Sequence, residues 1–169
     1  MFEKFGEFDS AEEMNKKAEE LKKAGDTEKI YDLARENGID KEDAEDFISG
    51  FQEEFASPLM AAAGKIKAES NNLEIAGVLE DWSNVVLRLC AENVQIARKA
   101  RKKSRSLAGC MAELIAFSFE NKIEVSNEIV KITKIEHNGK KEQLRGPLYM
   151  GVPNNAEVKR IAEKYYKEG

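Results

Sequence analysis

The chain has 169 residues, of which 41% are hydrophobic and 35% are charged, with one histidine and two cysteines. This length suits one domain of ordinary size or two small ones, and it is enough to bury a core. The first residues mix charges without an apolar segment, and no uncharged apolar stretch approaches the ~20 residues that span a bilayer. We therefore expect a cytoplasmic protein that neither carries a secretory signal nor crosses a membrane.

Charge is distributed unevenly along the chain. Residues 1–57 contain 18 Asp or Glu and 8 Lys or Arg, a net charge of −10, whereas residues 58–169 contain 14 and 19, a net charge of +5. Ser57-Pro58 marks the boundary, because serine caps helices and proline suits their first turn. We predict an acidic helical subdomain over 1–57 and a helical core with a basic segment over 58–169, folded as one unit. The asymmetry indicates electrostatic partners, or attraction between the two halves.

The acidic half is predicted to form three short helices. The first begins after Ser10 and ends at Gly25, the second follows Asp26, and the third begins after Asp40. On the third helix, one arc at 100° per residue holds the apolar side chains, which are Ala44, Phe47, Ile48 and Phe51. The opposite side holds four carboxylates, which are Glu42, Glu45, Asp46 and Glu53. This face is either solvated or a partner-binding surface that imitates a row of phosphates.

Two longer helices are predicted next, and a basic segment follows them. Apolar spacing predicts helices from Pro58 to about Asn72 and from Ile75 to Cys90, with Trp82 in the core. Cys90 and Cys110 are isolated, which favours buried, reduced thiols over a disulfide or a zinc site. The basic segment holds six cations in eight residues: Arg98, Lys99, Arg101, Lys102, Lys103 and Arg105.

Drawn as a helix, the basic segment places four of its cations on one face, namely Arg98, Arg101, Lys102 and Arg105. Ala97, Ala100 and Ser104 take the opposite side, where small residues allow close packing. A row of cations suits the phosphates of DNA or RNA. It also suits an acidic protein surface, including the first third of this chain, and a solvated helix end is a third interpretation.

In the C-terminal third, the predicted secondary structure changes from helix to strand and hairpin before a last helix. A helix is predicted from Leu107 to about Asn121, and alternating β-branched residues predict a strand over 128–136. Asn138-Gly139 then predicts a hairpin turn, and Asn154 opens a last helix. The fold class predicted for the whole chain is mainly α: a compact bundle of about seven helices with one β-hairpin near the C-terminal end.

No catalytic constellation emerges from the sequence. It has neither a phosphate-binding GxxxxGK[ST] loop nor a GxGxxG turn, and its only histidine, His137, falls in the predicted hairpin turn. Carboxylate pairs fall on polar helix faces, where burial would not raise a pKa for acid catalysis. We expect no enzyme activity, no metal and no cofactor.

Several segments resemble known proteins. The residues Phe2 to Phe8, with Ala11 to Asn15 and Pro58 to Ala62, look like small proteins of phages and integrative elements of Firmicutes. The run Lys103 to Met111 and the closing Tyr165-Tyr166 resemble PcfK-like proteins, a group that includes inhibitors of Cas9. This resemblance covers about residues 103–168. It implies a mobile-element protein and an anti-CRISPR activity.

Two functions follow as expectations. The first is inhibition of a Cas nuclease, or of its complex with guide RNA, by competition at a surface, with the carboxylate face or the basic segment making the contact. The alternative is a nucleic-acid-binding accessory protein of conjugative transfer or phage replication, in which the basic segment binds DNA or RNA. The sequence leaves the oligomeric state open.

Overall fold

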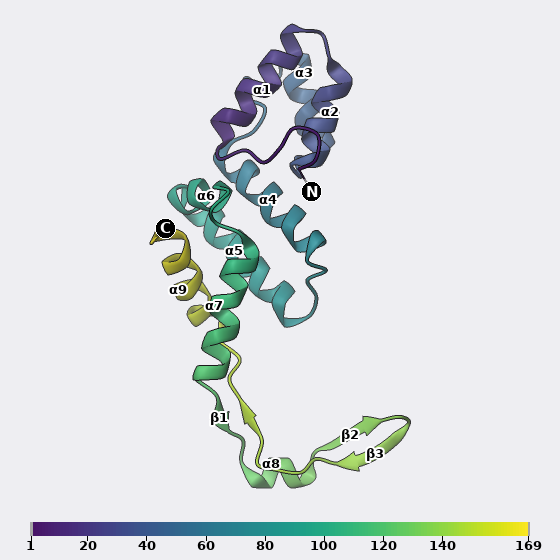
Figure 1. Ribbon diagram of the computed structural model, residues 1–169, viewed down its shortest axis with the longest axis vertical. Coiled ribbons are helices and arrows are strands. Elements are labelled where there is room, and N and C mark those ends of the chain that lie inside the picture. Colours follow the sequence, from purple (N-terminus) through teal and green to yellow (C-terminus); the bar gives the residue numbers. More distant parts are fainter. Residues whose placement is uncertain (1, 169) are drawn as a thin grey trace.

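The computed structural model describes residues 2–168. Within this range it contains nine helices and two small two-stranded sheets, so the prediction of a mainly α fold is confirmed, with more helices than the seven expected. Figure 1 shows an elongated molecule with α1–α3 at one end, a central body of α4–α7 and α9, and the strands with α8 at the other end. None of the helices in the described part of the chain has the length and apolar character needed to cross a bilayer.

The acidic end is built from three helices, α1 (Ala11–Lys23), α2 (Thr27–Glu36) and α3 (Lys41–Ser49). Ser10 caps α1 as predicted, because its hydroxyl accepts a hydrogen bond of 3.2 Å from the amide of Glu13. The helices bury one apolar cluster, to which the loop after α3 adds Phe55 and Ala56. The largest members of the cluster are Met14, Leu21, Ile30, Leu33, Phe47 and Phe55.

The central body contains α4 (Pro58–Asn72), α5 (Val78–Glu92), α6 (Val94–Arg101), α7 (Leu107–Glu120) and α9 (Asn155–Lys167). These helices bury a second cluster that includes Trp82, which confirms its predicted place in the core. Cys90 and Cys110 are free thiols in the same cluster, and burial raises the pKa of each to about 12. Both cysteines are therefore structural apolar residues.

Helix α4 belongs to both clusters. Ala61 packs with the acidic end, whereas Ala62 and Ile66 pack in the central body. Gly64 lies against the turn between α2 and α3, so closely that a Cβ atom added to it would lie 2.0 Å from the carbonyl oxygen of Asn37. The predicted boundary at Ser57-Pro58 is thus the start of a helix that the two parts share.

Residues 122–153 form what we call the arm, which extends away from the body (Figure 1). Strand β1 (Ile123–Glu124) pairs antiparallel with β4 (Tyr149–Met150), and these strands form the base of the arm. Beyond them lie α8 (Asn127–Ile132) and the hairpin of β2 (Lys134–His137) and β3 (Lys140–Gln143). The predicted hairpin turn is confirmed, because Asn138 and Gly139 both have positive φ, at 52° and 73°.

The strand predicted over 128–136 is wrong in its first half. The hydroxyl of Ser126 accepts a hydrogen bond from the amide of Glu128 and starts α8, so residues 127–132 are helical and the strand begins only at Lys134. Alternating β-branched residues favour a strand, but the cap at Ser126 starts a helix over the first of them. The pairing of β1 with β4 was not predicted, because each strand is only two residues long.

Candidate functional site

The basic segment is not one helical face, as the sequence predicted. Helix α6 ends at Arg101, because the backbone of Lys102 turns to φ −59° and ψ 140°. The buried ammonium group of Lys65 explains this ending: it donates hydrogen bonds to the carbonyl oxygens of Lys102 and Arg105, the latter at 3.2 Å. These contacts stabilise a turn after Arg101 in place of another helical turn.

Arg101 lies in the interior, with 1% of its surface exposed. Its Nη2 donates to Oδ1 of Asn37 at 2.9 Å, and its Nη1 donates to the carbonyl oxygen of Ala61 at 3.5 Å. Burial lowers the pKa of the guanidinium below its ordinary value, an effect that the carboxylates of Glu7 and Glu69 oppose. Arg101 connects the acidic end to the body and is not accessible to a phosphate in this conformation.

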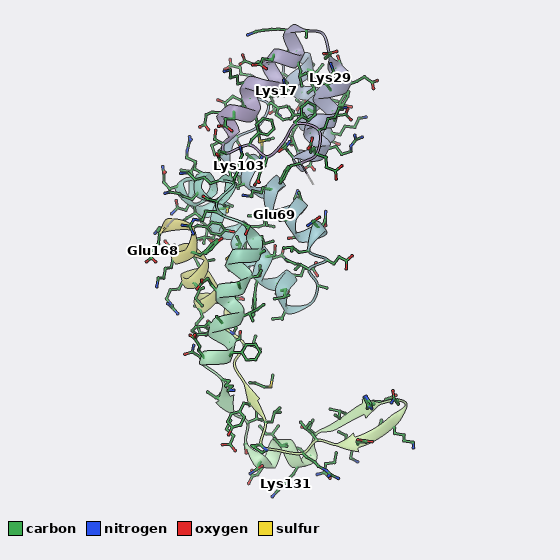
Figure 2. The ribbon with its side chains drawn as sticks, in the orientation of Figure 1. Lys17, Lys29, Glu69, Lys103, Lys131 and Glu168 are labelled. Atoms are coloured by element: carbon green, nitrogen blue, oxygen red, sulfur yellow. The ribbon has the colours of Figure 1, made fainter. Side chains whose placement is uncertain are left out.

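Two other residues of the segment contact the acidic half of the chain. Arg98 forms an ion pair with Glu12, and the backbone amide of Lys103 donates to Oδ1 of Asp9 at 2.8 Å. Figure 2 shows Lys103 at the junction of the acidic end and the body. These contacts agree with the interpretation in which the two halves attract each other.

The remaining cations differ in exposure. The guanidinium of Arg105 lies over the ring of Tyr165, 5.1 Å from its centroid, and its side chain is partly buried. Lys99 is partly buried on α6. Lys102 and Lys103 have exposed side chains in the turn. The structure therefore keeps at most part of the predicted cationic surface available to a ligand.

A buried charge network supports this junction, and the sequence analysis missed it. Lys65 is fully buried, with its Nζ 3.0 Å from Oε1 of Glu7 and 3.9 Å from Oε1 of Glu69. Glu69, labelled in Figure 2, accepts a 2.6 Å hydrogen bond from the amide of Leu107 through Oε2. Burial raises the pKa of Glu69, so the expectation that carboxylates fall on polar helix faces, where burial would not raise a pKa, is wrong for this residue.

A signal for this network was present in the sequence. At 100° per residue, Lys65 and Glu69 fall between Ala61 and Ala62, inside the arc that the apolar residues of α4 define. Two opposite charges one helical turn apart on an apolar face indicate a buried pair. Lys65, paired with Glu7, and Arg101, bonded to Asn37, each connect the acidic end to the body.

The predicted carboxylate face is only partly helical. Glu42 and Glu45 are exposed on α3. Asp46 is partly buried, and its Oδ2 accepts a hydrogen bond of 3.4 Å from the side-chain Nε2 of Gln52. Glu53 is exposed but lies beyond the helix, because Gly50 takes a left-handed conformation (φ 83°) and ends α3 at Ser49. The placement of Glu53 on one helical face with the other three carboxylates is therefore wrong.

The same helix end changes the place of Phe51. The sequence placed Phe51 in the apolar seam of the third helix, but 85% of its surface is exposed. Its amide donates to the carbonyl oxygen of Asp46 at 2.9 Å, which is the hydrogen bond that closes the helix. An aromatic side chain is thus presented among carboxylates.

We call residues 40–54 the acidic segment. It contains seven carboxylates and one cation, Lys41, which pairs with Glu45 at 3.0 Å. The carboxylates are Asp40, Glu42, Asp43, Glu45, Asp46, Glu53 and Glu54. Among residues 2–168, no group of three or more His, Cys, Asp or Glu side chains is arranged to hold a metal ion. The chemistry that this segment offers is the binding of cations, as on a basic macromolecular surface.

Comparison of the chain with models of known protein families, with curated proteins and with solved structures gives no match.

Proposed function

We propose that this is a cytoplasmic binding protein of a mobile genetic element, which inhibits a Cas nuclease by occupying a basic surface of the nuclease or of its guide-RNA complex. The resemblance of the sequence to phage and integrative-element proteins and to PcfK-like proteins supports this function. The observation that carries it is the acidic segment, which contains seven carboxylates and a single cation.

The physical basis is charge complementarity. Cas9-type nucleases hold nucleic acid in positively charged channels and read a short duplex motif through arginines. Glu42 and Glu45 are exposed about one helical turn apart on α3, and Glu53 and Glu54 are exposed on the loop that follows. Carboxylates at such spacing compete with phosphates for arginine and lysine side chains.

A cleavage assay with a Cas9 nuclease and guide RNA tests the proposal. The variant Glu42→Lys, Glu45→Lys and Glu53→Lys changes only exposed side chains, so we expect the fold to be kept and inhibition to fall by roughly tenfold or more, since like charges then face each other. The matched control is Glu80→Lys, Glu113→Lys and Glu120→Lys, which makes the same change in net charge at exposed positions of α5 and α7.

The outcomes separate the candidates. Loss of inhibition in the first variant and not in the control supports the proposal. If the parent protein does not slow cleavage, the proposal fails for that nuclease. If both variants inhibit as well as the parent, the acidic segment is not the contact.

Nucleic-acid binding by an accessory protein of transfer or replication is the second candidate, and it is supported by the exposed side chains of Lys102 and Lys103. Since Arg101 is buried and Arg98 is paired with Glu12, fewer cations support it than the sequence suggested. Salt-sensitive binding of DNA or RNA by a protein that does not inhibit cleavage would favour this candidate.

A further inference from the structure

The arm has almost no core of its own. Within residues 122–153 only Val130 and Pro153 are buried. Seven large apolar side chains of the arm are exposed: Ile123, Ile129, Ile132, Ile135, Tyr149, Met150 and Val152. A two-stranded hairpin and a six-residue helix are marginally stable alone, so a surface of this kind is typically covered by a partner.

The surface area of the whole chain leads to the same conclusion. Its accessible surface is 10487 Å², whereas a folded monomer of this mass is expected to expose roughly 8400 Å². The excess of roughly 2100 Å² exceeds the roughly 800 Å² that each partner contributes to an interface of standard size. The extended shape of the molecule thus provides enough surface for a stable dimer.

The arm contains a groove between α8 and the β2–β3 hairpin, with a volume of about 940 Å³. The amide of Leu144 donates to the carbonyl oxygen of Thr133 at 2.9 Å, and the side chain of Gln143 donates to the carbonyl oxygen of Lys131, so the hairpin and α8 are held together. The groove is lined by apolar Val130, Ile135 and Leu144, by two cations, Lys131 and Arg145, and by one acid, Glu142.

The two cations of the groove are available to a partner. Lys131 and Arg145 are exposed, and within residues 2–168 neither forms an ion pair. Figure 2 shows Lys131 at the far end of the molecule from the acidic helices. The occupant that fits is a segment with an apolar anchor beside carboxylates.

The acidic segment of the same sequence has these features. Phe51 is 85% exposed, and Glu53 and Glu54 follow it on an exposed loop. This loop leads out of α3, which lies at the opposite end of the long axis from the arm, so the loop and the groove of one chain do not meet (Figure 1). A second copy of the chain can bring them together.

We propose that two copies form an antiparallel dimer in which Phe51 of each copy enters the groove of the other, with Glu53 and Glu54 beside Lys131 and Arg145. A twofold axis perpendicular to the long axis makes both contacts at once. Assembly then stops at two copies, because no loop and no groove is left open. The dimer is inferred without reference to the proposed nuclease inhibition. Both would use Glu53, so a nuclease that binds the acidic segment would compete with the second copy.

The experiment measures the mass of the full chain by sedimentation or light scattering over a range of concentrations. The parent protein is expected at twice the 19.0 kDa of one chain, with weaker association in 1 M salt. One variant changes the loop (Phe51→Ala, Glu53→Lys, Glu54→Lys) and another changes the groove (Lys131→Glu, Arg145→Glu). Each alone is expected to weaken dimerisation by roughly tenfold or more.

Mixing the two variants is the decisive step. In a mixed dimer, the unchanged loop of the groove variant meets the unchanged groove of the loop variant. At the second contact, the lysines introduced in the loop meet the glutamates introduced in the groove, so their charges attract. The mixture is therefore expected to recover the dimer mass. The matched control is Phe119→Ala, which removes an aromatic ring with 70% exposure on α7 and should leave the mass unchanged.

Three results would overturn the proposal. These are a parent protein that stays monomeric at every concentration in low salt, variants that dimerise as the parent does, and a mixture that stays monomeric. A circular dichroism spectrum equal to that of the parent shows that a variant is folded. The cleavage assay is read separately, so failure of nuclease inhibition does not affect this result.

Discussion

At the scale of single residues, burial decides the roles of the charged side chains. Arg101 and Lys65 are cations in the interior, and each is held by carbonyl oxygens or polar side chains of other segments. Breaking one member of such a network leaves an uncompensated charge, which costs about 3–5 kcal/mol. Arg101 therefore has a structural role in a segment whose composition suggested ligand binding.

The titration of Glu69 allows the network to be tested through the pH dependence of stability. Its raised pKa means that the folded protein binds the proton more tightly than the unfolded chain, so its contribution to stability falls as pH rises above its ordinary value of 4.5. Below 4.5 the carboxyl is protonated in both states and contributes no pH dependence. The variant Glu69→Gln keeps an acceptor for the amide of Leu107 and removes the titration.

Urea unfolding of the parent and of Glu69→Gln between pH 4 and 8 measures the effect. We expect the free energy of unfolding of the parent, minus that of the variant, to decrease as pH rises from about 4.5 and then to level off. A difference that increases with pH would show that Lys65 and Arg101 hold the pKa of Glu69 below its ordinary value.

At the scale of secondary-structure elements, the sequence predicted most helices, including the ends of α1, α4 and α7, but missed what ends α3 and α6. The starts of α1, α4 and α7 follow Ser10, Ser57 and Ser106, whose hydroxyls accept the expected amide hydrogen bonds. These caps are local, so sequence patterns find them. The ends of α3 and α6 depend on a left-handed Gly50 and on the distant Lys65, and the contact with Lys65 is not visible in local spacing.

The contact between α4 and the α2–α3 turn provides a test of packing between elements. Gly64→Ala in an isolated helix would be stabilising by about 1 kcal/mol. Here the added methyl group would lie 2.0 Å from the carbonyl oxygen of Asn37, so α4 and the turn must separate. We expect the free energy of unfolding to fall by about 1–3 kcal/mol.

Urea unfolding of the parent and of Gly64→Ala measures whether the substitution raises or lowers the free energy of unfolding, and this sign is the informative result. A more stable Gly64→Ala protein would mean that α4 and the turn do not approach so closely in solution. As a comparison, Gly146→Ala places its methyl group no closer than 3.3 Å to the nearest atom, so its cost should be smaller.

At the scale of the whole molecule, the charge asymmetry of the sequence corresponds to a physical junction. The acidic end contacts the body through Glu12 with Arg98, Glu7 with Lys65, and Asn37 with Arg101. Composition revealed the asymmetry, and only the fold shows which charges pair across it. The shape of the arm could not be predicted, because its elements are short and depend on pairing between residues far apart in the chain.

The shared helix leads to a prediction about cooperativity. The chain has one tryptophan, Trp82, which reports on the cluster in the body, whereas circular dichroism reports on all helices. Since α4 contributes to both clusters, we expect the two signals to change together in urea, as for one folded unit. Loss of circular dichroism at lower urea than the fluorescence change would show that the acidic end unfolds by itself.

The division of α4 between two clusters also limits where recombination can join this coding sequence to another without disrupting the fold. A recombination joint at codon 57, where the composition changes, would leave the acidic helices without Ala61 and would give the body a helix whose Ala61 face has lost its partner. Joints within the arm interrupt neither cluster, apart from the pairing of β1 with β4. New sequence is therefore tolerated best in the arm, whereas the acidic end and the body have to be inherited together.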